Sequence, residues 1–483
     1  MAVAPFGCGG NTQHTNAGDA GATADASDSG GAPSTPVAPW WTLPAGSRYF
    51  SRDGRQTPLL MRNISAPSVA AFLPLLEAAH RAGARAVRIQ LTQGFGYDTL
   101  GIDSHGAVLK DWAASWDSVI KAARAQDLAV IPVFGIWGDW NNGDPDQGWV
   151  HFNANPLNQA LGGPAASPAE LFQDSATQRA WLGWLAQLID RWQDAPNIIA
   201  WEIFSELDLA TGGTAQNATH FAEIAADLIH AHDPAARPVF ASTSDLPLIS
   251  GEPWLDLWQG RGADLVSIHP YDPELDETVA TRVAAALAAT AKPVFIGESG
   301  LDAAAPDGTT LTSMPSARAG MQQAVWTELT SGAASARALY WEDGYAAYYP
   351  QTGLPLVHAL NDLDEVAARW LTDADYTGLA PIGAVSEPPV FGSLLANQTQ
   401  VRGFLRSKQL APPDWVAPPL PAVQLSISFF EPTRDGEWAV TFTTPSGEPL
   451  PVVHATSRRN VLEVTSPPGF TSLAFVAAPV PPP

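Results

Sequence analysis

Short apolar runs alternate with amphipathic, helix-like segments from Trp41 to about residue 380, and this alternation most constrains the fold. Strands that alternate with helices favour a parallel sheet covered by helices. Eight runs have the length and composition of buried strands: 59–62, 84–91, 128–134, 197–204, 238–242, 264–269, 293–297 and 337–341. Eight such units in roughly 330 residues predict an α/β fold, a (β/α)8 TIM barrel.

The clearest helix is expected over Ala176–Trp192. Its apolar side chains recur at the spacing of a single helix face, and Asp174 or Ser175 supplies an N-cap. The apolar stripe consists of Trp181, Trp184, Leu185, Leu188, Ile189 and Trp192. Further helices are expected near 66–82, 112–126, 220–232, 277–290, 315–330 and 355–371.

The composition changes at both ends of the predicted barrel, which spans 41–380. Residues 1–40 are dominated by small and polar side chains, and we expect a disordered N-terminal tether there. Over 381–483, short β-rich runs with turn signals replace the helices and predict a small all-β sandwich domain. Its strands are expected at 401–405, 423–429, 437–443 and 461–464.

Charge and composition exclude several classes of function. The 25 basic and 49 acidic residues give a net charge of −24, which argues against nucleic acid and anionic membrane surfaces as partners. No apolar run approaches the roughly 18 residues of a transmembrane segment. Cys8 is the only cysteine, so an intrachain disulfide and a cysteine zinc site are excluded. The ten histidines show no metal-ligand spacing. We therefore expect no metal and no organic cofactor.

Two glutamates, Glu206 and Glu298, each end an apolar run, on the fourth and seventh predicted strands. Barrels of this type place their chemistry at the C-terminal ends of the strands. Two carboxyl groups across a barrel mouth suit glycosidic bond cleavage, because one protonates the leaving oxygen and the other attacks the sugar. The alternative is that both are ordinary strand-end acids that face solvent.

The two glutamate runs also carry a family resemblance. The sequence Trp-Glu-Ile-Phe-Ser-Glu, which ends at Glu206, resembles the acid/base strand of the large retaining glycosidase clan that includes glycoside hydrolase family 5. The sequence Ile-Gly-Glu-Ser-Gly around Glu298 resembles the nucleophile strand of that clan. The resemblance covers residues 45–480 and is greatest to cellulase- and mannanase-like members with a C-terminal β-sandwich. It implies Glu206 as the acid/base and Glu298 as the nucleophile.

The resemblance implies substrate-binding residues as well. Arg88, on the second strand, looks like the arginine that orients the nucleophile. His269 and Tyr271 end the sixth strand, where the clan has an aromatic residue that hydrogen-bonds the nucleophile. Trp341, at the end of the eighth strand, looks like the platform under the sugar. Trp137 follows the third strand and either lines a sugar subsite or packs within its loop.

Ser205 departs from the clan pattern, which has Asn immediately before the acid/base. Serine is shorter and has one donor, so we expect a contact with the sugar 2-hydroxyl that needs a water or a differently placed sugar. Glu202 shares strand parity with Glu206 and also points inward. An ion pair with a barrel arginine is the simpler interpretation of Glu202, with direct catalysis as the alternative.

Within the predicted N-terminal tether, Cys8 stands directly before the flexible, acidic segment 9–39, and this arrangement resembles the acylation site of a bacterial lipoprotein. The charged and apolar parts of a signal peptide are missing upstream of it. The lipoprotein interpretation implies lipidation of Cys8 and a secreted or cell-surface anchored protein. The alternative is a single unmodified cysteine.

Together these features predict an O-glycosyl hydrolase that cleaves β-glycosidic bonds by a two-glutamate double displacement. The expected substrate is a neutral polysaccharide or oligosaccharide of the β-mannan or β-glucan class, and the expected state is a monomer. One alternative is a catalytically weak or silent carbohydrate-binding surface protein on the same barrel. Another is an acidic structural surface protein without a glycan site.

Overall fold

The computed structural model describes residues 36–93, 100–141, 152–173, 175–301, 314–340, 353–382, 390–429 and 435–481. Cys8, nearly all of the predicted tether and Trp341 lie outside these ranges, so the expectations for them stay predictions. Val37–Pro483 form one compact unit, and the predicted division near residue 381 likewise stays a prediction. Within the described ranges, none of the helices has the length and apolar character needed to cross a membrane.

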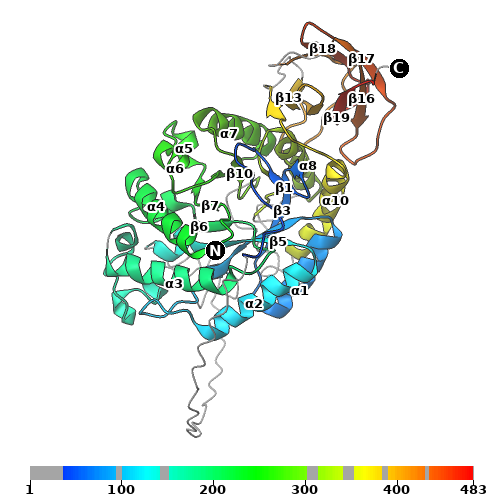
Figure 1. Cartoon of the computed structure of the whole chain (residues 1–483). Coiled ribbons are helices and arrows are strands. Elements are labelled where there is room, and N and C mark those ends of the chain that lie inside the picture. Colours follow the sequence, from blue (N-terminus) through cyan, green and yellow to red (C-terminus); the bar gives the residue numbers. More distant parts are fainter. Residues whose placement is uncertain are drawn as a thin grey trace. The chain divides into compact units, whose positions relative to one another are not determined.

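Parallel strands form the centre of this unit, and helices lie around them (Figure 1). One sheet has the order β11-β3-β4-β5-β6-β7, and another has the order β10-β9-β8. Their side chains are buried throughout, as expected for a parallel sheet with both faces covered. The strands are β3 (Leu59–Asn63), β4 (Ala86–Gln90), β5 (Ala129–Ile136), β6 (Trp201–Ser205), β7 (Val239–Phe240), β8 (Ser242–Ser244), β9 (Val266–His269), β10 (Val294–Ile296) and β11 (Ser335–Ala336).

The two sheets continue into each other and curl into a barrel-like fold. On one side, Ala241 alone separates β7 from β8. On the other side, the Ala334 N–H donates to the Val294 carbonyl at 2.7 Å, and the Ser299 N–H donates to the Ala338 carbonyl at 2.9 Å. The expected α/β class, with a curled parallel sheet, is therefore confirmed.

The predicted helices are present, and α3 (Ala176–Trp192) begins and ends at the expected residues. Ser175 is its N-cap, because the Ser175 hydroxyl accepts a hydrogen bond from the Gln178 N–H at 3.2 Å. The other helices are α1 (Val69–Arg81), α2 (Lys110–Ala125), α4 (Ala215–His232), α5 (Leu246–Ile249), α6 (Leu255–Gln259), α7 (Leu275–Ala289), α8 (Met314–Thr330) and α10 (Gly353–Leu371). A short antiparallel pair, β1 (Phe50–Arg52) and β2 (Arg55–Thr57), precedes β3.

The eighth strand matches its predicted range, 337–341, only in part: Leu339 pairs with Ser299 in an isolated parallel bridge, but the regular pairing lies earlier, at β11. The structure pairs β11 with β3 ahead of the expected residues 337–341. Arg337 has a left-handed backbone with φ 65°, which is uncommon for a residue other than glycine and ends the regular pairing. Buried carboxylates hold this turn, since Glu328 accepts from the Arg337 N–H and Asp364 binds the guanidinium.

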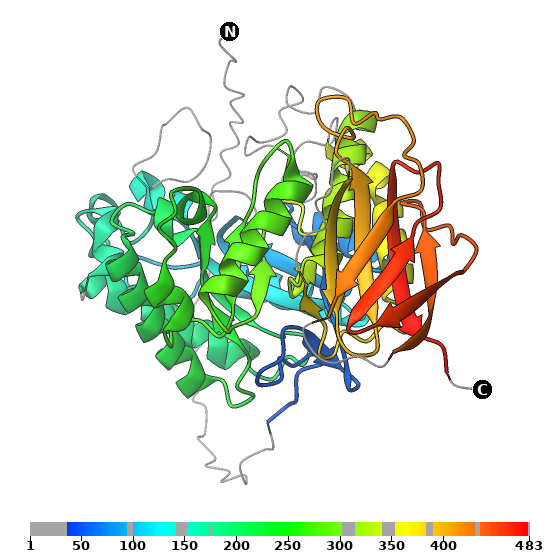
Figure 2. The same ribbon diagram turned by 90° about the horizontal axis from the view of Figure 1, so that it is seen from above.

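The C-terminal residues form an antiparallel sheet (Figure 2). The sheet has the order β12-β13-β14-β19-β16-β17-β18-β15. Inward side chains from across it, among them Leu425, Trp438 and Phe475, share one apolar core, which is consistent with the expected β-sandwich. The strands are β12 (Ala380–Pro381), β13 (Val390–Ala396), β14 (Val401–Ser407), β15 (Gln424–Ser428), β16 (Gly436–Thr443), β17 (Val453–Arg458), β18 (Val461–Thr465) and β19 (Ser472–Pro479).

A buried ion pair joins the antiparallel sheet to helix α7. Arg406 on β14 binds Asp276, and its Nη2 lies 2.7 Å from Glu277 Oε1. Burial raises the pKa of Asp276 to about 6, although the charge of Arg406 opposes this shift. Next to this pair, the rings of Trp326 and Phe404 stack with centroids 6.4 Å apart. The sheet is therefore fixed to the helices by both charge and apolar packing.

Candidate active site

Polar side chains gather at the edge where the parallel strands end. Gln90 is the last residue of β4, Ser205 the last of β6 and His269 the last of β9. Glu206 directly follows β6, and Glu298 comes two residues after β10. Because the carboxyl ends of parallel strands meet at one edge, these residues lie where barrel folds place their active sites.

Glu298 is buried and accepts hydrogen bonds on both carboxylate oxygens. Its Oε1 accepts from Arg88 Nη1 at 2.7 Å and from Gln90 Nε2 at 2.9 Å. The Ser205 hydroxyl donates to the same oxygen at 3.3 Å, and the Tyr271 hydroxyl donates to Oε2 at 2.9 Å. Donors arranged in this way stabilise the ionised form of a carboxyl group.

Every N–H group of Arg88 has a partner. Nε and Nη2 donate to the two oxygens of Glu202 at 2.6 and 2.8 Å, and Nη2 also donates to the Ser205 hydroxyl at 3.0 Å. Nη1 donates to Asn63 Oδ1 at 3.1 Å as well as to Glu298. The ion pair expected for Glu202 is therefore confirmed, and its two-point geometry fixes the guanidinium plane.

Glu206 has a left-handed backbone, with φ 59° and ψ 59°. Such conformations in residues other than glycine cluster at functional sites. The Glu206 N–H donates to the Ser242 hydroxyl at 3.1 Å, and this hydroxyl donates to Glu202 at 2.9 Å. The barrel interior therefore holds the turn that presents the Glu206 side chain.

The two glutamates have pKa values shifted in opposite directions. Burial raises the pKa of Glu206; a hydrogen bond from His269 opposes this shift, and the charge of Glu298 adds to it. Burial also acts to raise the pKa of Glu298, but the charges of His269 and Arg88 outweigh it and lower that pKa. One oxygen of each carboxyl group lies within 4.8 Å of the other. Burial is thus offset by neighbouring charges and donors at Glu298 but not at Glu206, so the two carboxyl groups differ in how readily they hold a proton.

His269 lies between the two carboxyl groups. Its Nδ1 is 2.9 Å from Glu206 Oε1 and 3.7 Å from Glu298 Oε2. Burial acts to lower the pKa of His269, but the charge of Glu298 and the hydrogen bond with Glu206 raise it overall. Gly297 leaves space for the ring, because a Cβ at that position would lie 2.7 Å from His269 Nε2.

Sequence patterns do not single out Asn63, Gln90 or Tyr340, which complete the surroundings of Glu298. The Tyr340 hydroxyl donates to Gln90 Oε1 at 2.6 Å, and Asn63 Nδ2 donates to the Ala338 carbonyl at 2.9 Å. For Gln90, strand parity is the one signal in the sequence that could have identified the residue. Gln90 is two residues after Arg88, so both side chains point to the same side of β4.

Of the predicted substrate-binding residues, two make contacts within the protein that differ from the expected contacts with sugar, and a third is not described by the structure. Ser205 is buried, and its hydroxyl belongs to the network around Arg88 and Glu298. Trp137 begins a 3-10 turn after β5 and packs against the barrel core while partly exposed, so packing accounts for part of its role. Trp341 lies outside the described residues.

Among the described residues, one group has ligand atoms close enough together for a metal ion, and it consists of Glu206, His269 and Glu298. Hydrogen-bond donors already bind both oxygens of Glu298. The positive charge of Arg88, 2.7 Å from Glu298, disfavours a second cation beside it. We therefore assign no metal to these three residues.

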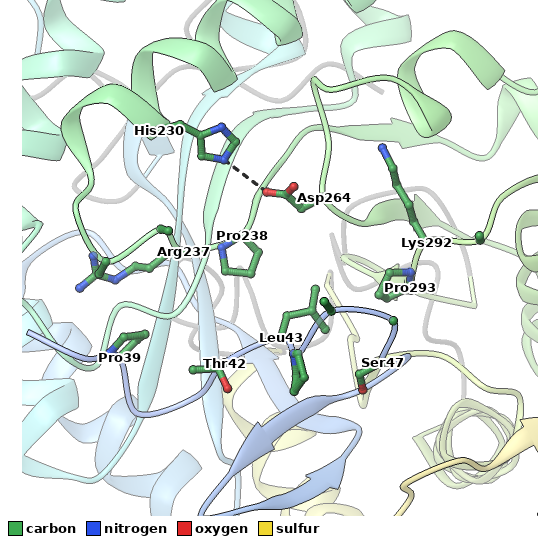
Figure 3. A pocket seen from close by; sticks show the side chains of 16 residues that line it. Pro39, Thr42, Leu43, Ser47, His230, Arg237, Pro238, Asp264, Lys292 and Pro293 are labelled. Atoms are coloured by element: carbon green, nitrogen blue, oxygen red, sulfur yellow. Dashed lines mark ion pairs between the residues drawn. The ribbon is translucent and has the colours of Figure 1, made fainter.

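A cavity of about 430 Å³ lies at the opposite end of the strands (Figure 3). It is lined by part of residues 39–47 and by the segments that precede β7, β9 and β10. Its two strongly basic side chains bind backbone carbonyls: Arg237 Nη2 donates to Gln193 at 2.8 Å, and Lys292 Nζ donates to Ala263 at 2.6 Å. Since these donors serve the fold, the cavity does not present the convergent polar groups of a substrate site.

Comparison with solved structures identifies the class of fold as that of (β/α)8 glycoside hydrolases. A glycoside hydrolase family 5 protein from Bacteroides vulgatus matches with a TM-score of 0.60 at 12% sequence identity, over 92% of this chain and 95% of that chain. The exo-β-1,4-mannosidase Op5Man5 from an Opitutaceae bacterium matches with a TM-score of 0.51 at 14% identity, over 69% of this chain and 64% of that chain. No protein-family model matches the sequence, and no curated protein is similar to it in sequence. The resemblance to the clan that includes family 5 is thus confirmed at the level of the fold.

Proposed function

We propose that this protein is a retaining β-glycoside hydrolase with Glu298 as nucleophile and Glu206 as acid/base. The observation that carries the proposal is the approach of the two carboxyl groups to within 4.8 Å, with opposite pKa shifts. Retaining enzymes hold these groups about 5–5.5 Å apart, whereas inverting enzymes leave room for a water at about 6.5–9.5 Å.

In the first step, Glu298 attacks the anomeric carbon while Glu206 protonates the departing glycosidic oxygen. Oε1 of Glu298 accepts from Arg88, Gln90 and Ser205, whereas Oε2 accepts from Tyr271. We assign Oε2 as the attacking atom, because its lone pairs are less engaged. The raised pKa of Glu206 keeps a proton available for the leaving group.

In the second step, water attacks the anomeric carbon of the ester that links the sugar to Glu298, and ionised Glu206 takes a proton from this water. The bond between the anomeric carbon and Glu298 breaks, which returns Glu298 to its carboxylate form. Forming this ester removes the negative charge of Glu298, which is one cause of the raised pKa of Glu206. The pKa of Glu206 then falls, so the acid of the first step becomes the base of the second. The hydrogen bond from His269 stabilises the ionised form.

For the substrate, we propose a neutral β-linked polysaccharide or oligosaccharide of the mannan or glucan class. The net charge of −24 disfavours polyanionic chains. A protein named as a β-1,4-mannosidase shares the fold, which supports the inclusion of mannans. Sizing the products released from mannans and glucans distinguishes endo from exo cleavage.

The test combines hydrolysis of a panel of aryl β-glycosides with trapping by a 2-deoxy-2-fluoro glycoside that matches the best substrate. We expect hydrolysis with retained anomeric configuration and labelling of Glu298, located by peptide mass spectrometry. Labelling of another carboxyl group would refute the assignment. Glycan binding without hydrolysis would instead favour the catalytically silent carbohydrate-binding protein.

We further propose that Cys8 carries a lipid anchor at the cell surface. Its position directly before the flexible segment 9–39 supports this. The native protein should partition into the detergent phase of a two-phase extraction, and Cys8→Ser should partition into the aqueous phase. An aqueous native protein with a free thiol would contradict the anchor and leave the enzyme proposal intact.

A further inference from the structure

The side chains around Glu298 determine what holds the 2-hydroxyl of the sugar. This hydroxyl is on the carbon next to the one that Glu298 attacks, so it must lie beside the carboxylate. Hydrogen bonds to it strengthen toward the transition state and contribute to the rate. A donor that contacts Glu298 and still has an unused proton is therefore placed to bind it.

Three of the donors around Glu298 have no proton left. The five N–H groups of Arg88 bind protein oxygens. The single proton of the Ser205 hydroxyl is directed at Glu298 Oε1, and that of Tyr271 is directed at Oε2. His269 Nε2 has no partner among the described residues, but it is fully buried and lies close to the backbone of Gly297, so a sugar hydroxyl at the mouth does not reach it.

Gln90 differs because its amide nitrogen carries two protons. One is donated to Glu298 Oε1 at 2.9 Å, and the other meets no acceptor among the described residues. The orientation of the amide is fixed, since an ionised carboxylate only accepts and the nitrogen must face Glu298. The Tyr340 hydroxyl, 2.6 Å from Gln90 Oε1, holds the other end of the amide.

The exposure of Gln90 is consistent with a contact to substrate. The residue is 5% exposed, so bulk water does not generally satisfy its second N–H group. An unsatisfied buried donor is costly, which favours a ligand that accepts from it. Gln90 ends strand β4 at the edge where Glu206 and Glu298 lie, so a sugar attacked by Glu298 passes within its reach.

We propose that the Gln90 carboxamide donates its second N–H to the 2-hydroxyl of the sugar at the cleavage site. This inference rests on the proposed function. It makes Gln90 a substrate-contacting residue and Tyr340 a positioning residue. It also moves the 2-hydroxyl contact from Ser205 on β6, where the sequence predicts it, to β4.

The experiment compares kcat/KM on an aryl β-glycoside and on its 2-deoxy analogue. Gln90→Met keeps the length of the side chain but removes the amide, and should shrink the wild-type penalty for the missing hydroxyl about tenfold, as expected for one hydrogen bond. Ser205→Ala is the matched control, because it removes a hydroxyl from the same oxygen of Glu298. Its 2-deoxy penalty should equal that of the wild type.

An equal penalty in Gln90→Met and the wild type would overturn the inference and leave the proposed function intact. A wild-type protein that hydrolyses neither substrate would overturn both. Tyr340→Phe provides a second variant in case Gln90→Met does not fold. It frees the amide to rotate and should lose part of the 2-deoxy penalty, with most of the change in kcat; an unchanged penalty and unchanged kcat would also overturn the inference.

Discussion

The ends of strands β10 and β6 carry the same residue type in opposite electrostatic surroundings. Glu298, after β10, accepts from a guanidinium, an amide and two hydroxyl groups. Glu206, after β6, has an imidazole beside its carboxyl group. The comparison teaches that the donors and charges at each strand end, rather than the residue type, decide in which direction the pKa of the carboxyl group shifts.

Glu202 connects these two strand ends. It binds Arg88, which holds the Glu298 carboxylate, and it accepts from Ser242, which holds the Glu206 backbone. Both glutamates are therefore positioned from one buried carboxylate beneath them. Their separation follows from the barrel interior rather than from the loops at its mouth.

Removing the charge of Glu298, the carboxyl group with more hydrogen-bond donors around it, should have the largest effect. Glu298→Gln should keep the fold, because the amide is nearly isosteric, and should lower kcat by several orders of magnitude. Steady-state kinetics measure the loss, with thermal unfolding as the check on folding. Glu223→Gln, a change of a carboxyl group on the outer helix α4, should retain wild-type turnover. Turnover by Glu298→Gln near the wild-type value would place the nucleophile elsewhere.

The effect of removing the carboxyl group of Glu206, which has fewer donors around it, should depend on the substrate. Glu206→Ala should slow substrates with poor leaving groups far more than activated aryl glycosides, because only the former need protonation. Added azide should restore turnover and give a β-glycosyl azide, since it replaces the water that Glu206 activates. Equal losses on both kinds of substrate, without azide rescue, would contradict the acid/base role.

Removing one of the hydroxyl groups that donate to Glu298 should move one limb of the pH profile of kcat/KM. Glu298 must be ionised to attack, so activity is present above its lowered pKa and is lost as the pH falls through that pKa. Tyr271→Phe removes a donor to Oε2 and should raise this pKa, so the acid limb of kcat/KM moves to higher pH. The basic limb, which reports loss of the proton from Glu206, should stay in place. Movement of the basic limb alone would reverse the two roles.

The smallest effect is expected at Ser205, which lies between the two ends. Its hydroxyl is buried against Arg88 and Glu298, so Ser205→Asn must displace one of them. We expect kcat/KM to fall about tenfold on both gluco- and manno-configured substrates, the cost of modest overpacking. A gain on the gluco substrate would show instead that residue 205 reaches the sugar.

The fold was predictable where local patterns carry the information. The apolar stripe of α3 and the apolar runs that end in Glu206 and Glu298 are visible in the sequence alone. The bounds of the eighth strand were not predictable, because the left-handed turn at Arg337 depends on buried partners from other segments. Strand β19 was also missed, since it is buried on both faces over most of its length and lacks an alternating pattern.

The site was predictable in its carboxyl groups but not in the contacts that set their charge. Gln90 donates to Glu298 across 208 residues of chain, and His269 meets Glu206 across 63. Single-sequence patterns are local, so they do not pair such residues. Strand parity narrows the choice to inward-facing positions, and only the curvature of the sheet determines which of these meet.

Gly297 has a consequence for how the site can evolve. A Cβ at this position would lie 2.7 Å from His269 Nε2 and 2.8 Å from Ser267 Oγ. A lineage therefore gains a side chain at 297 only after residues 269 and 267 have become smaller or moved. That first change would remove or displace the imidazole beside Glu206, so any mutational route away from glycine passes through an ancestor with altered surroundings of Glu206.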